Sequence, residues 1–230
     1  MKRGIPEDIR AINETIRAFL DTKDRTTGIP IRRALGVYAF YDYDNEPIYV
    51  GQTEEGLGSR IGRHMTNQRT DAVAMNVLDP FEVASIEVWP LRYGRPLKED
   101  SLAFQAELNA AEYTVFDYVL QRSTLGAILN EKDIAPAPLI SLPDSYKATI
   151  VPNAVYVARS HPDIRIARRA NTIAQLAQVI SERDVSSGLR RTLVTQARRL
   201  QILTQSRFIE LGGRVPVELP GEETGEELAP

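Results

Sequence analysis

Apolar positions in the first part of the chain change from helical spacing to a strand-like pattern. Between residues 6 and 21 they recur every three or four positions, and Pro6 with the acidic pair after it suits a helix N-terminus, so a helix is predicted there. The aromatic segment 36–43, the polar turn Asp44-Asn45-Glu46 and the segment 47–51 predict a β-hairpin. The chain is therefore expected to open with a helix followed by two paired strands.

Three more elements are predicted after the hairpin. Residues 57–65 place apolar side chains on one helical face, and residues 81–91 form a third strand that Pro90 is expected to end. Residues 101–122 carry the broad apolar face of a long helix. We therefore expect an α/β (α+β) fold in which a small, central, antiparallel three-stranded sheet is flanked by helices, with helical extensions at both ends.

The second half of the chain begins with a proline-rich connector and is predicted to be mainly helical. Residues 154–158 could form one more strand. Helices are predicted over 172–182, with Thr172 as N-cap, and over 187–211, where two glycines end the pattern. The chain thus divides into an N-terminal helical arm (1–34), a core (35–135), an arginine-rich helical extension (136–215), and an acidic tail (216–230) that is expected to be disordered.

The composition excludes several classes of site. There are no cysteines and only 2 histidines, so disulfides, cysteine-ligated zinc or iron–sulfur centres and a histidine-rich metal cage are ruled out. Any metal must then be a hard cation on oxygen ligands. No apolar stretch approaches the roughly 20 residues needed to cross a bilayer, and the N-terminus lacks a signal-peptide pattern. A soluble, cytoplasmic protein with no membrane partner is expected.

Charge is distributed unevenly along the chain. The net charge is only -3, yet ten arginines lie between Ala158 and Arg207 against three acidic residues, and the tail after them is acidic. A basic region of this kind is typical of a surface that binds nucleic acid.

One constellation of residues carries recognisable chemistry. Gly36-Val37-Tyr38 and Tyr49-Val50-Gly51 lie on the two strands of the predicted hairpin, and Gln52-Thr53 follows the second motif. Next come a helix on which Arg60 and His64, four residues apart, share a face, a third strand, a helix that contains Glu112, and finally Asn130. In this order the segment 35–130 resembles the GIY-YIG nuclease superfamily, so that the core becomes a GIY-YIG nuclease core.

The resemblance implies hydrolysis of a phosphodiester bond in DNA. Such a reaction needs a nucleophilic water, a group that takes its proton, and positive charge near the phosphate. Glu112 is the candidate ligand for one Mg²⁺ ion, with Mn²⁺ as an alternative. Arg60 would clamp the phosphate oxygens, and Tyr38 would orient or deprotonate the water.

Three further residues are implied in supporting roles. His64 would donate or accept a hydrogen bond with one of the tyrosines and share the proton, and Tyr49 would complete that network. Asn130 would bind backbone or phosphate near the metal. The separation of Glu112 from Asn130 is longer than is usual in the superfamily, and Val37 stands where the motif name has isoleucine.

Structural readings of the same residues stay open. Tyr38 and Tyr49 could pack a small core, and Arg60 could be a solvated charge. Glu107 is a rival to Glu112, but it lies five residues earlier and therefore about 140° around the helix. Arg63 is a similar rival to Arg60, and we count it among the candidate DNA-binding residues.

Target choice must come from other parts of the chain. The arginines taken as candidate DNA contacts are Arg63, Arg168, Arg169, Arg190, Arg191 and Arg198. They could instead form solvated helix faces, and the same helices could form a dimer contact. Size and layout resemble the type II restriction endonucleases of the superfamily, which implies a homodimer that cuts double-stranded DNA and a DNA methyltransferase encoded nearby. A repair or mobile-element nuclease, or a non-catalytic DNA-binding protein on the same fold, is the alternative.

Overall fold

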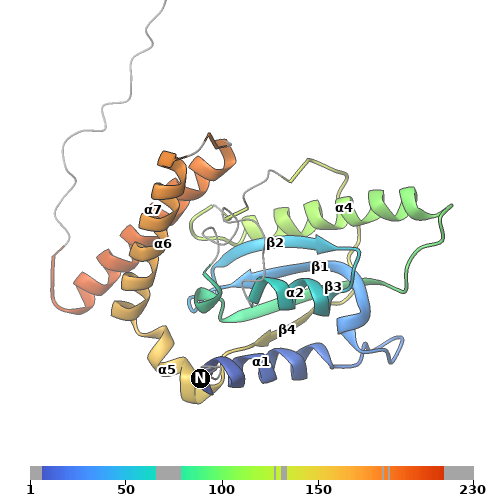
Figure 1. Ribbon diagram of the computed structural model, residues 1–230, viewed down its shortest axis with the longest axis horizontal. Helices are drawn as coiled ribbons and strands as arrows, with labels where there is room; N and C mark the ends of the chain where they lie inside the picture. The colour runs from blue at the N-terminus through green and yellow to red at the C-terminus, as the bar shows by residue number, and fades with distance from the viewer. Residues whose placement is uncertain are drawn as a thin grey trace, which may run out of the picture.

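A computed structural model describes residues 7–65, 79–126, 128–130, 134–182, 184–185 and 187–214. These residues form a mixed α/β fold built on one antiparallel sheet with the strand order β2-β1-β3-β4 (Figure 1). Its strands are β1 (Ala34–Tyr41), β2 (Pro47–Thr53), β3 (Ser85–Tyr93) and β4 (Tyr146–Thr149). The helices are α1 (Glu7–Leu20), α2 (Leu57–Met65), α4 (Ser101–Leu120), α5 (Asn153–Ser160), α6 (Pro162–Glu182) and α7 (Ser187–Glu210), with short 3-10 turns η1 (Ile31–Arg33) and η2 (Pro80–Glu82).

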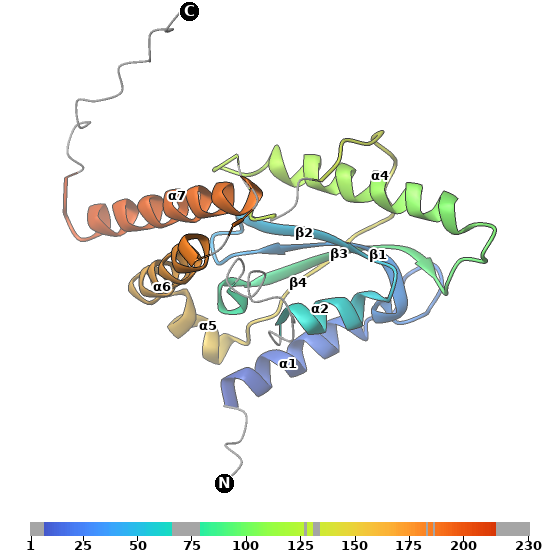
Figure 2. The ribbon, with the colours of Figure 1, turned by 45° about the horizontal axis from the view of Figure 1, so that its top comes forward.

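Helices cover both faces of the sheet, with α4 on one face and α1 and α2 on the other (Figure 2). The central strand β1 is buried at every position. Tyr38 and Phe40 point to the side of α1 and α2, whereas Val37 and Tyr41 point to the side of α4. This alternation follows from the two-residue period of a strand. Because of this alternation, the Tyr38 side chain lies on the same face of the sheet as helix α2, which carries Arg60 and His64.

The prediction of three strands was wrong by one strand. The fourth, β4, comes from the proline-rich connector and pairs with β3 from Ser85↔Thr149 to Val88↔Tyr146. The segment 154–158, which could have been a strand, lies within helix α5. That helix starts directly after Pro152, whose carbonyl accepts hydrogen bonds from the amides of Val155 and Tyr156. Short apolar runs fit either element, and here the proline and its local hydrogen bonds select the helix.

Two predicted element boundaries were also wrong. Strand β3 continues past Pro90 to Tyr93, because Pro90 lies opposite Gly36 at a bulge of β3, where Leu91 is the extra residue and the regular ladder is interrupted. Helix α6 begins at Pro162, well before Thr172, which is a buried residue within the helix and not its N-cap. A proline followed by an acidic residue suits a first helical turn. The predicted tail from residue 216 lies outside the described residues.

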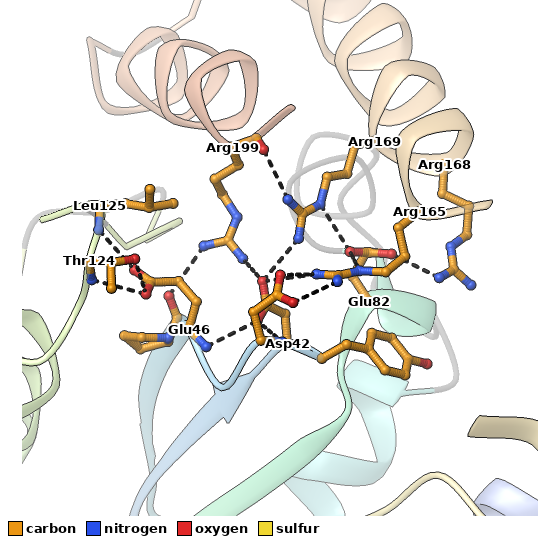
Figure 3. Close-up of polar contacts among 12 residues, drawn as sticks. Asp42, Glu46, Glu82, Thr124, Leu125, Arg165, Arg168, Arg169 and Arg199 are labelled. Atoms are coloured by element: carbon orange, nitrogen blue, oxygen red, sulfur yellow. Dashed lines mark hydrogen bonds and ion pairs between the residues drawn. The ribbon is translucent and has the colours of Figure 1, made fainter. Parts of the chain in front are cut away.

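Helices α6 and α7 form a pair at the end of the sheet where the β1–β2 turn lies (Figures 1 and 2). A buried ion cluster joins them to that turn (Figure 3). Both Arg169 and Arg199 bind Oδ2 of Asp42, at 2.9 and 2.5 Å, and Nε of Arg169 binds Oε2 of Glu82 at 3.0 Å. Arg165 binds Asp42 and the exposed Asp44 as well. The C-terminal helices are therefore packed onto the core through paired charges. Within the described ranges, no helix is long and apolar enough to cross a membrane.

Candidate active site

The hydroxyl group of Tyr38 lies at the centre of the candidate site. The tyrosine side chain is fully buried in the sheet, and its hydroxyl lies 2.7 Å from Nε2 of His64. Nε of Arg60 donates a longer hydrogen bond of 3.3 Å to the same oxygen. The structure thus brings a tyrosine from the first motif together with both polar residues of α2.

Helix α2 positions these two partners through its spacing. Leu57, Ile61 and His64 are its buried residues and therefore lie against the sheet. Arg60 is only partly buried, so its guanidinium group reaches both Tyr38 and the surface. Burial acts to lower the pKa of Arg60, but attraction to the two tyrosines of the motifs outweighs it and the pKa is raised. Arg60 stays a cation that can bind a phosphate from solvent.

Tyr49, from the second motif, completes an aromatic group around the histidine. Its ring centroid lies 5.1 Å from that of His64 and 6.1 Å from that of Tyr38. Phe40 stacks on Tyr49 from the same face of the sheet. The rings hold His64 in one orientation, which fixes the nitrogen that meets Tyr38.

Glu112 approaches the site from α4, which packs against β1 and β2. Burial raises the pKa of Glu112 to about 7, although Arg60 and a backbone hydrogen bond from Gln52 both lower it. A carboxylate that is partly removed from water in this way gains from a nearby cation. Glu107 on the same helix is exposed.

Asn130 supports the edge strand. Its side-chain amide donates to the carbonyl of Val50 at 2.8 Å, and its Oδ1 accepts from the amide of Val50 at 3.1 Å. The two bonds imitate a neighbouring strand at the middle residue of the second motif. Of the two partners expected for Asn130, the structure shows the backbone.

Gln52 is a further candidate site residue, and the motifs predicted no role for it. Its Nε2 donates to Oδ1 of Asn109, one helical turn before Glu112, at 2.8 Å. Its Oε1 is buried, and no described residue donates a hydrogen bond to it. The signal was available in the sequence, because Gln52 follows the second motif directly.

The oxygen donors around α4 suit a hard divalent cation. The Glu112 carboxylate and the unsatisfied Oε1 of Gln52 both belong to this region. Mg²⁺ binds through one or two carboxylates and takes its other ligands from water and phosphate. In the described part of the chain, no group of three or more His, Cys, Asp or Glu residues is arranged to hold a metal. Glu112 and Gln52 therefore fit Mg²⁺, which needs few ligands from the protein.

The predicted DNA-binding arginines fall into different environments. Arg169 is 5% exposed and belongs to the buried ion cluster, so it does not present its charge to DNA and we withdraw it as a candidate. Arg168 is mostly buried beside Glu82. Arg63 is partly exposed and binds Glu55 at 2.5 Å. Arg190, Arg191 and Arg198 are exposed on α7.

Four predicted residues, Tyr38, Tyr49, Arg60 and His64, are therefore in one contact network. Glu112 joins it through its electrostatic interaction with Arg60. Neither a protein-family model, nor a curated protein, nor a solved structure matches the chain.

Proposed function

We propose that this protein is a Mg²⁺-dependent DNA endonuclease of the GIY-YIG type. The observation that carries the proposal is the buried Tyr38 hydroxyl held between Nε2 of His64 and Nε of Arg60. A tyrosine that only packed a core would not need a histidine and an arginine on one oxygen. The resemblance of the motifs and the raised pKa of the Glu112 carboxyl support the same reading.

Tyr38 acts as the group that takes the proton of the attacking water. An isolated tyrosine, with a pKa near 10, is a poor base at neutral pH. The guanidinium of Arg60 favours the ionised oxygen, and His64, with Nε2 unprotonated, accepts the proton that Tyr38 releases. The water proton then passes to the tyrosine oxygen while the water oxygen forms its bond to phosphorus. The bond from phosphorus to the leaving oxygen breaks, and that oxygen takes a proton from solvent.

Arg60 binds the non-bridging oxygens of the phosphate, where negative charge accumulates as the bond forms. Glu112 and Oε1 of Gln52 are the groups that would hold Mg²⁺. When bound, the ion supplies a second positive charge at the phosphate. The Tyr49 ring keeps His64 oriented. Asn130 holds the backbone of β2 in place through its hydrogen bond to Val50.

More specifically, we propose that the protein acts as a homodimer and cuts double-stranded DNA at specific sites, as type II restriction endonucleases do. It is supported by the exposed arginines of α7. Large apolar side chains are also exposed along and just after α7 and supply a surface for a second copy: Val194, Ile202, Phe208, Ile209 and Leu211. A dimer in analytical ultracentrifugation that dissociates in Ile209→Asp is expected. A wild-type monomer would contradict this part of the proposal.

The nuclease activity is tested by incubating the protein with mixed plasmid and phage DNA in Mg²⁺ or in EDTA. Discrete fragments that require Mg²⁺ are expected, and Glu112→Gln should abolish them. Glu107→Gln is the matched control, because this carboxylate lies exposed on the same helix and points elsewhere. Cleavage limited to nicked or branched substrates would favour a repair nuclease. No cleavage of duplex, nicked or branched DNA would exclude the proposed activity.

A further inference from the structure

A groove of about 730 Å³ lies beside the candidate active site. It is formed by the C-terminal end of α1, the turn η1 and the first turn of α2. Arginine heads and backbone form much of its wall, and Leu20 is the single large apolar residue among those that line it in the described structure: Arg17, Leu20, Asp21, Arg32, Arg33, Glu55, Gly56, Gly58 and Ser59. Small-molecule pockets are mostly apolar, so this lining favours a polar, anionic ligand.

The side chains that line the groove leave an excess of positive charge. Asp21 is bound by Arg32 at 2.8 Å, and Glu55 is bound by Arg63 at 2.5 Å. Both carboxylates that line the groove are thus already paired. Arg17 and Arg33 are exposed, and no carboxylate of a described residue lies within ion-pair distance of either. Two positive charges are therefore left to face a ligand.

Two glycines that line the groove lie where η1 packs against the start of α2. A Cβ on Gly58 would lie 2.9 Å from Cβ of Arg32, so the glycine lets η1 pack directly on α2. Gly56 precedes it with a φ of +107°, in the region that favours glycine. Ser59 adds a hydroxyl group that can donate to a phosphate oxygen.

Two elements connect the groove with the catalytic network along the chain: helix α2 and the segment that runs from η1 into β1. Ser59, which lines the groove, is followed in α2 by Arg60. Arg33, also in its wall, leads into β1, where Tyr38 is the fifth residue onward. At about 3.3 Å per extended residue, this separation is roughly 16 Å. Since DNA rises about 3.4 Å per nucleotide along each strand, the span corresponds to about five nucleotides.

We propose that this groove binds the phosphate backbone of the DNA strand that flanks the scissile bond, with Arg17 and Arg33 as the phosphate contacts. The inference rests on the proposed nuclease function and assigns part of the substrate surface to the N-terminal helical arm, outside the motif-bearing segment. Neither arginine belongs to the catalytic network. Contacts of this kind position the strand without reading its sequence.

The test measures binding of a fluorescein-labelled DNA duplex of mixed sequence, followed by anisotropy over a series of salt concentrations. The protein carries Glu112→Gln so that no cleavage occurs. Arg17→Gln/Arg33→Gln is compared with Arg122→Gln/Arg214→Gln, which removes the same charge from two exposed arginines outside the groove. The logarithm of the association constant falls linearly with the logarithm of the salt concentration, and each phosphate contact adds about 0.9 to the steepness of this line. For the groove variant, which lacks two contacts, the line should be less steep by about 1.8 than for the protein with both arginines. The dissociation constant should rise about tenfold or more near physiological salt.

The outcomes separate the two proposals. A groove variant whose salt slope and affinity equal those of the control variant would overturn the groove, even if the wild-type protein cuts DNA. Wild-type protein that binds duplex with the predicted loss in the groove variant, yet never cleaves, would support the groove and exclude the nuclease. Wild-type protein that neither binds nor cuts duplex overturns both. Circular dichroism of all variants checks that the fold is kept.

Discussion

Gly51 and Tyr38 face each other across the β1–β2 hairpin, and only a glycine fits opposite the tyrosine. A Cβ placed on Gly51 would lie 2.6 Å from the Tyr38 hydroxyl oxygen and 2.8 Å from the ring carbon that carries it. The ring of Tyr38 thus lies over the neighbouring strand. The last residue of the second motif is a glycine because Tyr38, from the first motif, occupies the space that its side chain would fill.

We therefore expect Gly51→Ala to disable the site while the fold persists. The new methyl group would overlap the Tyr38 hydroxyl and the Tyr49 ring, so the hydroxyl must shift, and displacements of about 1 Å can cost roughly 100-fold in rate. Single-turnover DNA cleavage is the measurement. Gly62→Ala is the control, because a Cβ there would meet nothing within 4 Å. It should keep the cleavage rate and, as a helical glycine, change stability by at most about 1 kcal/mol. Equal rates for both variants would contradict the proposed role of the tyrosine hydroxyl.

Removing the hydroxyl itself should separate catalysis from packing. Tyr38→Phe keeps the buried ring, so cleavage is expected to fall by about 10²–10⁴-fold while unfolding changes by roughly 1 kcal/mol. Tyr41→Phe is matched to it, since Tyr41 lies on the same strand and its hydroxyl binds Glu87 at 2.7 Å on the opposite face. That variant should lose a similar stability and keep its activity. A Tyr38→Phe enzyme with normal rates would show that another group takes the proton.

The sequence anticipated the hairpin and α2 because their signals are local. Aromatic alternation, a polar turn and a four-residue spacing placed Tyr38 and His64 correctly in chain and element. The fate of the arginines was not predictable in the same way. Arg169 and Arg198 belong to similar helical patterns, and only the first is buried. Its partner Asp42 lies 127 positions away in the chain, so no helical period can reveal the pairing. Strand β4 was missed for a related reason, because four residues within a proline-rich connector carry too short a pattern.

The buried ion cluster should matter for stability and not for chemistry. Asp42→Asn removes the negative charge that both Arg169 and Arg199 bind; Arg169 keeps Glu82, but the buried guanidinium group of Arg199 loses its carboxylate partner among the described residues. Breaking a buried pair in this way costs about 3–5 kcal/mol. Asp144→Asn is the control, because Asp144 pairs with Arg25 at the surface, where their side chains are 82% and 66% exposed, and its loss should cost about 1 kcal/mol or less. Urea denaturation of both variants measures the difference. Similar midpoints would mean that the cluster does not hold the C-terminal helices in place.

Asn130 is predicted to act through the backbone of β2. Asn130→Ala loses both hydrogen bonds to Val50, which should cost about 1–3 kcal/mol and slow cleavage by displacing the strand that carries the second motif. Asn130→Asp keeps the acceptor and sets a carboxylate against the carbonyl of Val50, so it should be at least as destabilised. If cleavage is lost in Asn130→Ala with no change in its unfolding midpoint, the residue binds substrate directly.

Glu112 provides a prediction about pH. Burial raises its pKa from an ordinary 4.5 to about 7, so the folded state holds the proton more tightly than the unfolded state does. The resulting stabilisation is complete below about pH 4.5 and is lost as the pH rises through about 7. In EDTA, Glu112→Gln should therefore become more stable relative to wild type between about pH 5 and pH 8, by at most about 3 kcal/mol. Urea denaturation at the two pH values measures this.

Added Mg²⁺ should stabilise the wild type at the higher pH and leave the variant unchanged, because the ion binds the ionised carboxylate. If the stability difference between variant and wild type does not change with pH, Glu112 is solvated in the folded protein, and its place beside the phosphate loses its physical basis.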